Sequence, residues 1–216
     1  RVLFRSDWGF CMPKALYDGL VDGDYDVETI TSTHAGTMKI LDFHIPGRSQ
    51  RTILLNAHNC HPYQANDDVS GCAVGIEVMK RLMKVPDRQL GYRLVIAPEL
   101  IGTTFWLRDI GAQASHFAAA LLLKAVGNDG PLRLQESFTG NAAIDRAAHH
   151  VFRHRYGRYE SGAFRTVYGN DETVFEAPGY QIPTISLTRM PFSAYHTSKD
   201  TPDSLSEESL EDTAAA

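Results

Sequence analysis

The sequence predicts an α/β fold, in which a central mixed, mostly parallel sheet lies between two layers of helices. Three observations lead to this prediction. Short apolar runs alternate with segments of helical periodicity, an order typical of a sheet that is covered on both faces. With 216 residues, 43% of them hydrophobic, the chain can bury one large core, so we expect one domain over residues 1–216. Polar side chains follow the apolar runs, where ligands bind in such sheets.

The expected strands are short and apolar. Residues 52–57 and 92–97 are runs of this kind, and residues 183–188 form a further one. Residues 118–126 begin with an Ala-rich stretch that leaves a helix open. The turn-forming residues 127–130 (Gly-Asn-Asp-Gly) favour a strand that ends there.

The expected helices lie between these strands. Residues 69–84 carry apolar side chains at helical spacing, namely Val69, Ala73, Ile76, Met79 and Met83. Residues 101–109 are expected to form a short helix. Residues 142–156 are also expected to be helical, with Asn141 as the N-cap residue.

The charge of the chain argues against two classes of partner. The formal net charge is −5 and there is no run of Lys or Arg, so we expect neither a nucleic acid nor a membrane partner. No apolar run reaches the roughly 20 residues of a membrane span. Cys11, Cys60 and Cys72 are odd in number and lack CxxC spacing, which favours a reducing compartment and hence the cytoplasm. The sequence leaves the oligomeric state open.

The segment after the first expected strand has the residues of a metal site. His58, Cys60, His61, Asp67 and Asp68 lie between this strand and the following helix. Zinc takes imidazole nitrogen and carboxylate oxygen as ligands, and carboxylates are favoured at a helix N-terminus. His58 lies nearest the strand end and His61 nearer Asp67, so the two compete for one ligand role. Cys60 could ligate as a thiolate, but a small buried thiol is the more common role.

Three further segments contribute candidates. Glu99 follows the second expected strand and could bind a metal or act as a general base. His196 follows the last expected strand and a short loop. Asp171 and Glu172 lie upstream of that strand, where they could orient metal ligands or supply a further base.

Two of these segments resemble a known family. Residues 66–71 (Asn-Asp-Asp-Val-Ser-Gly) resemble the ligand turn of zinc aminopeptidases and glutaminyl cyclases, and residues 195–201 (Tyr-His-Thr-Ser-Lys-Asp-Thr) resemble their closing His-Thr-x-x-Asp signature. The chain is most similar to aminopeptidase-like proteins of bacterial polysaccharide-biosynthesis gene clusters. Four motifs carry that likeness in the same order, namely residues 7–11, 58–62, 98–102 and 169–172.

The resemblance implies a three-layer zinc-exopeptidase fold and a zinc site. Asp67 and His196 would bind Zn²⁺ with His58 or His61 beside them, and Asp68 and Asp171 would support these ligands. Relatives with two metals carry a Glu-Glu pair where this chain has Pro98-Glu99. They also carry an Asp ligand after the strand that here ends near Lys124, so one zinc ion is expected and a second is left open. The family implies a small β domain before this region and a helical domain after it, so the chain is expected to be a fragment.

The function expected from these residues is hydrolysis of a peptide or amide bond in a small peptide or aminoacyl substrate. A zinc-activated water would attack, and Glu99 would take its proton, or Glu172 if Glu99 binds the metal. One alternative is a catalytically inactive, metal-containing binding module of the same fold. Another is a cysteine hydrolase that uses Cys60 with His58 or His61.

Overall fold

The computed structural model describes residues 9–216, so Asp7 and Trp8 of the first motif lie outside the described residues. Contacts divide the chain into two compact units, residues 1–36 and residues 37–216. In the first unit, the described residues are exposed and form one short helix, α1 (Lys14–Asp18). The second unit contains the sheet, both cores and every candidate site residue from His58 to His196.

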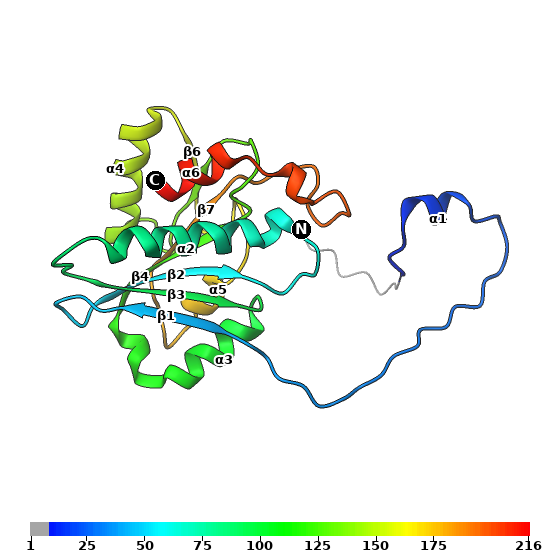
Figure 1. The fold of residues 1–216 in the computed structure, drawn as a ribbon, viewed down its shortest axis with the longest axis horizontal. Coiled ribbons are helices and arrows are strands. Elements are labelled where there is room, and N and C mark those ends of the chain that lie inside the picture. The colour runs from blue at the N-terminus through cyan, green and yellow to red at the C-terminus, as the bar shows by residue number, and fades with distance from the viewer. Residues whose placement is uncertain (1–8) are drawn as a thin grey trace. The chain divides into compact units, whose positions relative to one another are not determined.

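The second unit is built on a seven-stranded sheet with the order β1-β3-β2-β4-β7-β5-β6 (Figure 1). The strands are β1 (Leu41–Ile45), β2 (Thr52–His58), β3 (Gly91–Ala97), β4 (Phe117–Lys124), β5 (Arg133–Gln135), β6 (Glu160–Gly162) and β7 (Thr184–Thr188). Four neighbouring strands, β3, β2, β4 and β7, run parallel to one another. β1 pairs with β3 and β5 pairs with β7 in the antiparallel sense, so the predicted mixed, mostly parallel sheet is confirmed.

Helices cover both faces of this sheet, as Figure 1 shows. The helix α2 (Ser70–Met83), the helix α4 (Ala143–Tyr156) and the helix α6 (Glu207–Ala215) share one core with the sheet. The helix α3 (Ile101–Ile110) and the short α5 (Glu172–Phe175) pack on the other face. Three irregular helical turns complete the unit, namely Ala65–Val69, Gly111–His116 and Pro202–Ser204. The predicted three-layer α/β/α arrangement is therefore confirmed.

The two cores follow from the alternation of side chains along the strands. Leu55 and Leu94 point into the core under α2, where they meet Val74. Leu54 and Val95, each one residue away, enter the opposite core with the α3 residues that include Trp106 and Leu107. Because neighbouring residues of a strand face opposite sides, a strand that is apolar throughout can serve both cores.

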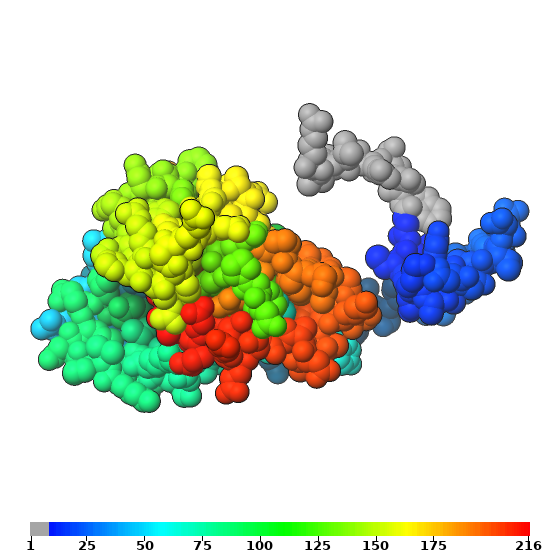
Figure 2. Space-filling model, turned by 90° about the horizontal axis from the view of Figure 1, so that it is seen from above, coloured from blue at the N-terminus to red at the C-terminus, as the bar shows by residue number. Residues whose placement is uncertain are grey.

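The C-terminal helix α6 is fastened to α2 and α4 by ion pairs. Arg81 of α2 contacts Glu211 at 2.6 Å, and Arg155 of α4 contacts Asp212 at 2.8 Å. The buried Arg189 reaches Asp212 from the end of β7 at 2.7 Å. Figure 2 views this helical face, with the C-terminal residues in red between the green α2 and the yellow-green α4.

The expected N-cap of α4 is wrong. The helix begins one residue later than Asn141 would require, with Ala142 at the cap position. Asp145 in the first turn turns back and accepts the Ala142 N–H at 2.8 Å, and it also accepts the backbone N–H and the hydroxyl of Ser137. Ala142 has no side chain that can accept an N–H of the first turn, and Asp145 instead supplies the reciprocal bond of a capping box, to the N–H of the cap residue.

The parallel strands end together, and this edge positions the candidate residues. His58 is the last residue of β2, Lys124 the last of β4 and Thr188 the last of β7, while Glu99 follows β3 by two residues. Across residues 9–216, none of the helices combines the length and apolar character that a membrane crossing requires.

Candidate metal centre

The centre of the site is the carboxylate of Asp67, which has no exposed surface. Its Oδ1 lies 3.2 Å from Nε2 of His58 and 3.8 Å from Nδ1 of His61. Its Oδ2 lies 3.0 Å from Nε2 of His196. The structure therefore brings together all four residues that the sequence singled out for metal binding, from the end of β2, the loop after it and the loop after β7.

One oxygen of Asp67 is left without a hydrogen bond. Oδ2 is buried and accepts none, although His196 approaches it. A buried carboxylate oxygen without a partner is costly, and a metal ion would satisfy it. One ligand atom each from His61, Asp67 and His196 lies within 4.8 Å of the others, and the two imidazoles and the carboxylate are ligands that zinc prefers. These three residues fit a zinc ion.

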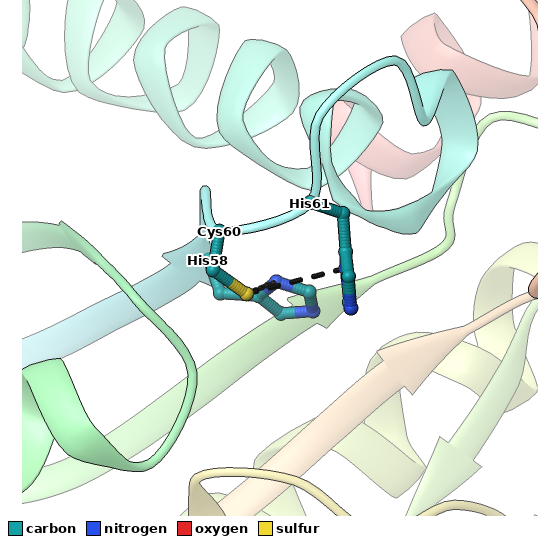
Figure 3. A group of neighbouring side chains, drawn as sticks. All are labelled: His58, Cys60 and His61. Atoms are coloured by element: carbon teal, nitrogen blue, oxygen red, sulfur yellow. Dashed lines mark hydrogen bonds between the residues drawn. The ribbon is translucent and has the colours of Figure 1, made fainter. Parts of the chain in front are cut away.

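A second grouping of metal-type side chains overlaps the first. His58, Cys60 and His61 also offer atoms within 4.8 Å of one another, and Figure 3 shows the three side chains together. Sγ of Cys60 lies 3.5 Å from Nδ1 of His58 and 4.0 Å from Nδ1 of His61. Burial raises the pKa of the Cys60 thiol, and the negative charge of Glu99 acts in the same direction. The thiolate that a cysteine nucleophile needs is therefore disfavoured here.

The loop that carries Asp67 is tied to the loop that carries His196. Oδ1 of Asp200 accepts the backbone N–H of Asn66 at 2.7 Å, and Oδ2 accepts that of Asp67 at 3.0 Å. Asn66 in turn accepts the Gly127 N–H through its side-chain oxygen at 2.8 Å. Because Asp200 lies four residues after His196, these bonds fix the distance between two candidate ligands that are far apart in sequence.

Asp68 holds the strand end in place. Its Oδ2 accepts the backbone N–H of His58 at 3.2 Å, while Oδ1 accepts those of Gly71 and Ala125. Burial raises the pKa of Asp68 well above its usual value. The side chain thus joins the ends of β2 and β4 to the start of α2, which is the supporting position that the sequence suggested for it.

Lys124 lies inside the site. The side chain is 1% exposed, and its Nζ contacts both Oδ1 of Asp67 and Nε2 of His58. Burial works to raise the pKa of Asp67, but the contacts with His58 and Lys124 outweigh it and hold that pKa well below its usual range. Burial lowers the pKa of His58 and the positive charge of Lys124 acts in the same direction, while the hydrogen bond with Asp67 opposes them.

Nε2 of His58 has two close partners. It contacts Nζ of Lys124 and lies 3.2 Å from Oδ1 of Asp67. Nδ1 of the same ring faces Cys60 at 3.5 Å. The nitrogen of His58 that points into the site is therefore already engaged by Lys124 and Asp67.

The candidate bases differ in accessibility. Glu99 is partly exposed at the sheet edge. Glu172 is fully buried, and its carboxylate accepts the backbone N–H of Asn170 at 2.7 and 2.9 Å, with Nε of Arg165 3.5 Å away. Burial raises the pKa of Glu172. Of the two, Glu99 has the carboxylate that is free to meet a water or a substrate.

Asp171 supports the segment after Glu99. Its Oδ1 accepts the Leu100 N–H at 2.6 Å and the hydroxyl of Thr103 at 3.0 Å. Burial, followed by the charges of Glu99 and Glu172, raises the pKa of Asp171 to about 7. Asp171 therefore anchors the backbone beside Glu99 and makes no contact with the imidazoles.

Two tyrosines connect Lys124 with His196. The Lys124 Nζ lies 4.9 Å from the ring centre of Tyr168, a cation–π distance. The Tyr168 hydroxyl is 3.0 Å from that of Tyr195, whose ring stacks on His196 with centroids 3.8 Å apart. His196 itself has a positive φ of 54°, a backbone conformation uncommon outside glycine and frequent at functional sites.

Sequence reasoning missed three contributors to this site. Lys124 served only as the marker of a strand end, although a lysine that closes an apolar run at the same edge as His58 is an available signal. Asp200 lay within the motif 195–201 without a role. Tyr168 stands next to the motif 169–172, and nothing in the local pattern distinguishes it from a core tyrosine.

Comparisons with known proteins agree with this fold. The family described as a domain of unknown function, DUF4910, matches residues 7–216. A Clostridium acetobutylicum protein, named for polysaccharide biosynthesis and an aminopeptidase-like domain, is 32% identical over 199 residues, which cover 91% of this chain and 45% of that protein. A crystal structure from the same organism, named as a peptidase, has a TM-score of 0.84 at 30% identity, covering 98% of this chain and 50% of that one.

More distant structures share the fold. The aminopeptidase from Aneurinibacillus sp. strain AM-1 has a TM-score of 0.70 at 21% identity, over 81% of this chain and 45% of its own. Porphyromonas gingivalis glutaminyl cyclase has a TM-score of 0.64 at 18% identity, over 82% of this chain and 74% of its own. The chain spans about half the length of the first relatives it matches. It belongs to the DUF4910 family and has the α/β fold of the zinc aminopeptidases and exopeptidases.

Proposed function

We propose that this chain is the catalytic part of a zinc-dependent hydrolase of the aminopeptidase type, which cleaves a peptide or amide bond. The observation that carries the proposal is the buried Asp67 carboxylate, whose Oδ2 accepts no hydrogen bond and faces His196, with His61 near Oδ1. We assign the metal to His61, Asp67 and His196, which leaves a fourth position for water, as in catalytic zinc sites. The likeness in fold to aminopeptidases supports this assignment.

A zinc ion held there would lower the pKa of a bound water to roughly 7 and polarise the carbonyl of the scissile bond. Glu99 would accept the proton of that water and pass it to the leaving amine. Its partial exposure and its place at the same sheet edge suit a group that meets both water and substrate. Asp171 would keep the Glu99 segment in place through the Leu100 N–H.

The substrate we propose is a small peptide or an aminoacyl amide. The His196 side chain is 53% exposed, so the metal position opens to solvent on the side of the loop 195–201. The negative net charge of −5 gives no electrostatic reason for a nucleic acid or a membrane as the substrate.

The test is a turnover assay of the zinc-loaded chain against a panel of aminoacyl anilides and N-acyl amides, with Glu99→Gln as the variant. Glu208→Gln is the matched control, because Glu208 is exposed on α6. We expect turnover that a chelator abolishes and that Glu99→Gln reduces, while Glu208→Gln retains it. Tight zinc binding without turnover of any substrate would instead favour the inactive, metal-containing binding module.

A further inference from the structure

The Asp67 carboxylate is divided between two environments. Its Oδ1 faces the Lys124 ammonium and His58, with His61 further off at 3.8 Å, whereas Oδ2 faces His196 and accepts no hydrogen bond. In sites with two metal ions roughly 3.5–4 Å apart, a pair of cations acts as a clamp on the reacting oxygens, and a carboxylate that bridges them would offer one oxygen to each. In this chain, the cation at Oδ1 of Asp67 is the ammonium of Lys124.

Lys124 is enclosed by three partners. A buried ammonium needs a carboxylate and further polar or aromatic partners to offset the loss of water. Lys124 has the Asp67 carboxylate, Nε2 of His58 and the face of the Tyr168 ring 4.9 Å away. At 1% exposure the side chain is enclosed.

From this geometry we propose that the ammonium of Lys124 takes the place of a second metal ion, so that the site binds a single Zn²⁺ through His61, Asp67 Oδ2 and His196. This inference rests on the proposed function, since it concerns the same site. His58 then lies at Oδ1 of Asp67, the oxygen that Lys124 contacts. Its Nε2 contacts both Lys124 Nζ and Asp67 Oδ1, and its imidazole orients these two side chains without binding zinc.

The proposal has a chemical consequence for the reaction. A lysine ammonium neutralises one unit of the negative charge and cannot activate a water as a Lewis acid can. Lys124 would hold the Asp67 carboxylate ionised and oriented so that Oδ2 points towards the zinc ion. Water activation would then fall to one metal ion and Glu99.

The experiment compares metal binding by the wild-type chain, Lys124→Asp and Lys124→His. Each is stripped with chelator and titrated with ZnSO₄, and bound zinc per chain is measured after gel filtration. The electron paramagnetic resonance spectrum with Mn²⁺ reports whether bound ions are isolated or coupled as a pair. Lys84→Asp is the matched control, because it makes the same change of charge at an exposed position after α2. Circular dichroism verifies that each variant is folded.

We expect one equivalent of zinc and isolated Mn²⁺ in the wild type and in Lys84→Asp. In Lys124→Asp and Lys124→His, removal of the ammonium should add a second equivalent and a coupled Mn²⁺ signal. Two equivalents in the wild type, or a single equivalent in both folded Lys124 variants, would overturn the inference and leave the proposed hydrolase intact. No zinc in the wild type would instead remove the proposed function itself.

Discussion

Lys124 and Asp67 form an ion pair in the interior, with at most 1% of either side chain exposed. The pair places a positive charge at one oxygen of the carboxylate and leaves the other free. Removing one partner of a buried ion pair leaves an uncompensated charge, which costs about 3–5 kcal/mol. Substitutions at this pair therefore affect both stability and metal binding. A substitution at the half-exposed His196 is expected to affect metal binding alone.

His196→Ala is expected to abolish tight zinc binding without unfolding the chain. The imidazole supplies one of three protein ligands, and its exposed position means that little apolar surface is lost. Zinc per chain after gel filtration and the urea midpoint of the metal-free protein measure the two effects. A full complement of zinc in the variant would show that His196 is not a ligand.

Asp67→Ala is expected to lose zinc and also to destabilise the metal-free chain by about 3–5 kcal/mol, since Lys124 would remain buried without its carboxylate. The double variant Asp67→Ala with Lys124→Met should recover part of this loss in urea denaturation but should not recover zinc. If the single variant is as stable as the wild type, the ion pair is not a buried one in solution.

His58 and His61 are expected to be unequal, with His61→Ala costing far more zinc affinity than His58→Ala. His61 is partly exposed and lies with Asp67 and His196, whereas His58 contacts Lys124 in the interior. The dissociation constants for zinc come from competition with a fluorescent chelator. A larger loss for His58→Ala, in a variant that circular dichroism shows to be folded, would reverse the assignment.

Glu99→Gln is expected to keep zinc content near normal and to lower kcat by roughly 10²–10⁴-fold, the usual contribution of a general base. The amide keeps the shape of the side chain but cannot take a proton. Glu172→Gln should mainly lower stability, because Glu172 is buried and accepts the Asn170 N–H. Loss of zinc in Glu99→Gln would make Glu99 a ligand instead.

The raised pKa of Asp171 predicts a pH dependence of stability. Because the folded-state pKa of about 7 exceeds the unfolded value of about 3.9, the folded state holds the proton more tightly between these limits. The contribution of Asp171 to the free energy of unfolding is fully present below about pH 4. It is lost as the pH rises through about 7, by up to about 1.4 kcal/mol per pH unit. Asp171→Asn should remove this dependence.

The measurement is the free energy of unfolding of the metal-free chain in urea at several pH values from 4 to 8. The wild type should lose stability relative to Asp171→Asn as the pH rises. Asp68, whose pKa is also raised, is present in both proteins and cancels in the difference. Parallel curves for the two proteins would contradict the assignment to Asp171.

The sequence predicted the central elements because their apolar patterns are strong. β2, β3, β4 and β7 are buried runs, and α2 has a clear helical period. β1 was missed although Leu41, Phe43 and Ile45 alternate with polar residues. It is an edge strand of five residues in which only Ile45 is buried, and so short an alternation is a weak signal. β5 and β6 have three residues each and are too short to show a period.

The candidate site was predictable where motifs lie within one loop, and less so where the contacts are between loops. His58, His61, Asp67 and His196 do meet, as the pattern indicated. The division of roles between the two histidines depends on Lys124, which reaches them from another strand. No spacing rule along the chain can show such a contact, because it arises from the order β2-β4 in the sheet.

The central claim is that zinc is bound by His61, Asp67 and His196 and not by the overlapping set of His58, Cys60 and His61. Zinc K-edge X-ray absorption of the chain loaded with one equivalent tests it directly. The account predicts nitrogen and oxygen neighbours only, at about 2.0–2.2 Å, including two imidazoles. A sulfur neighbour at about 2.3 Å would contradict it, since Cys60 would then be a ligand.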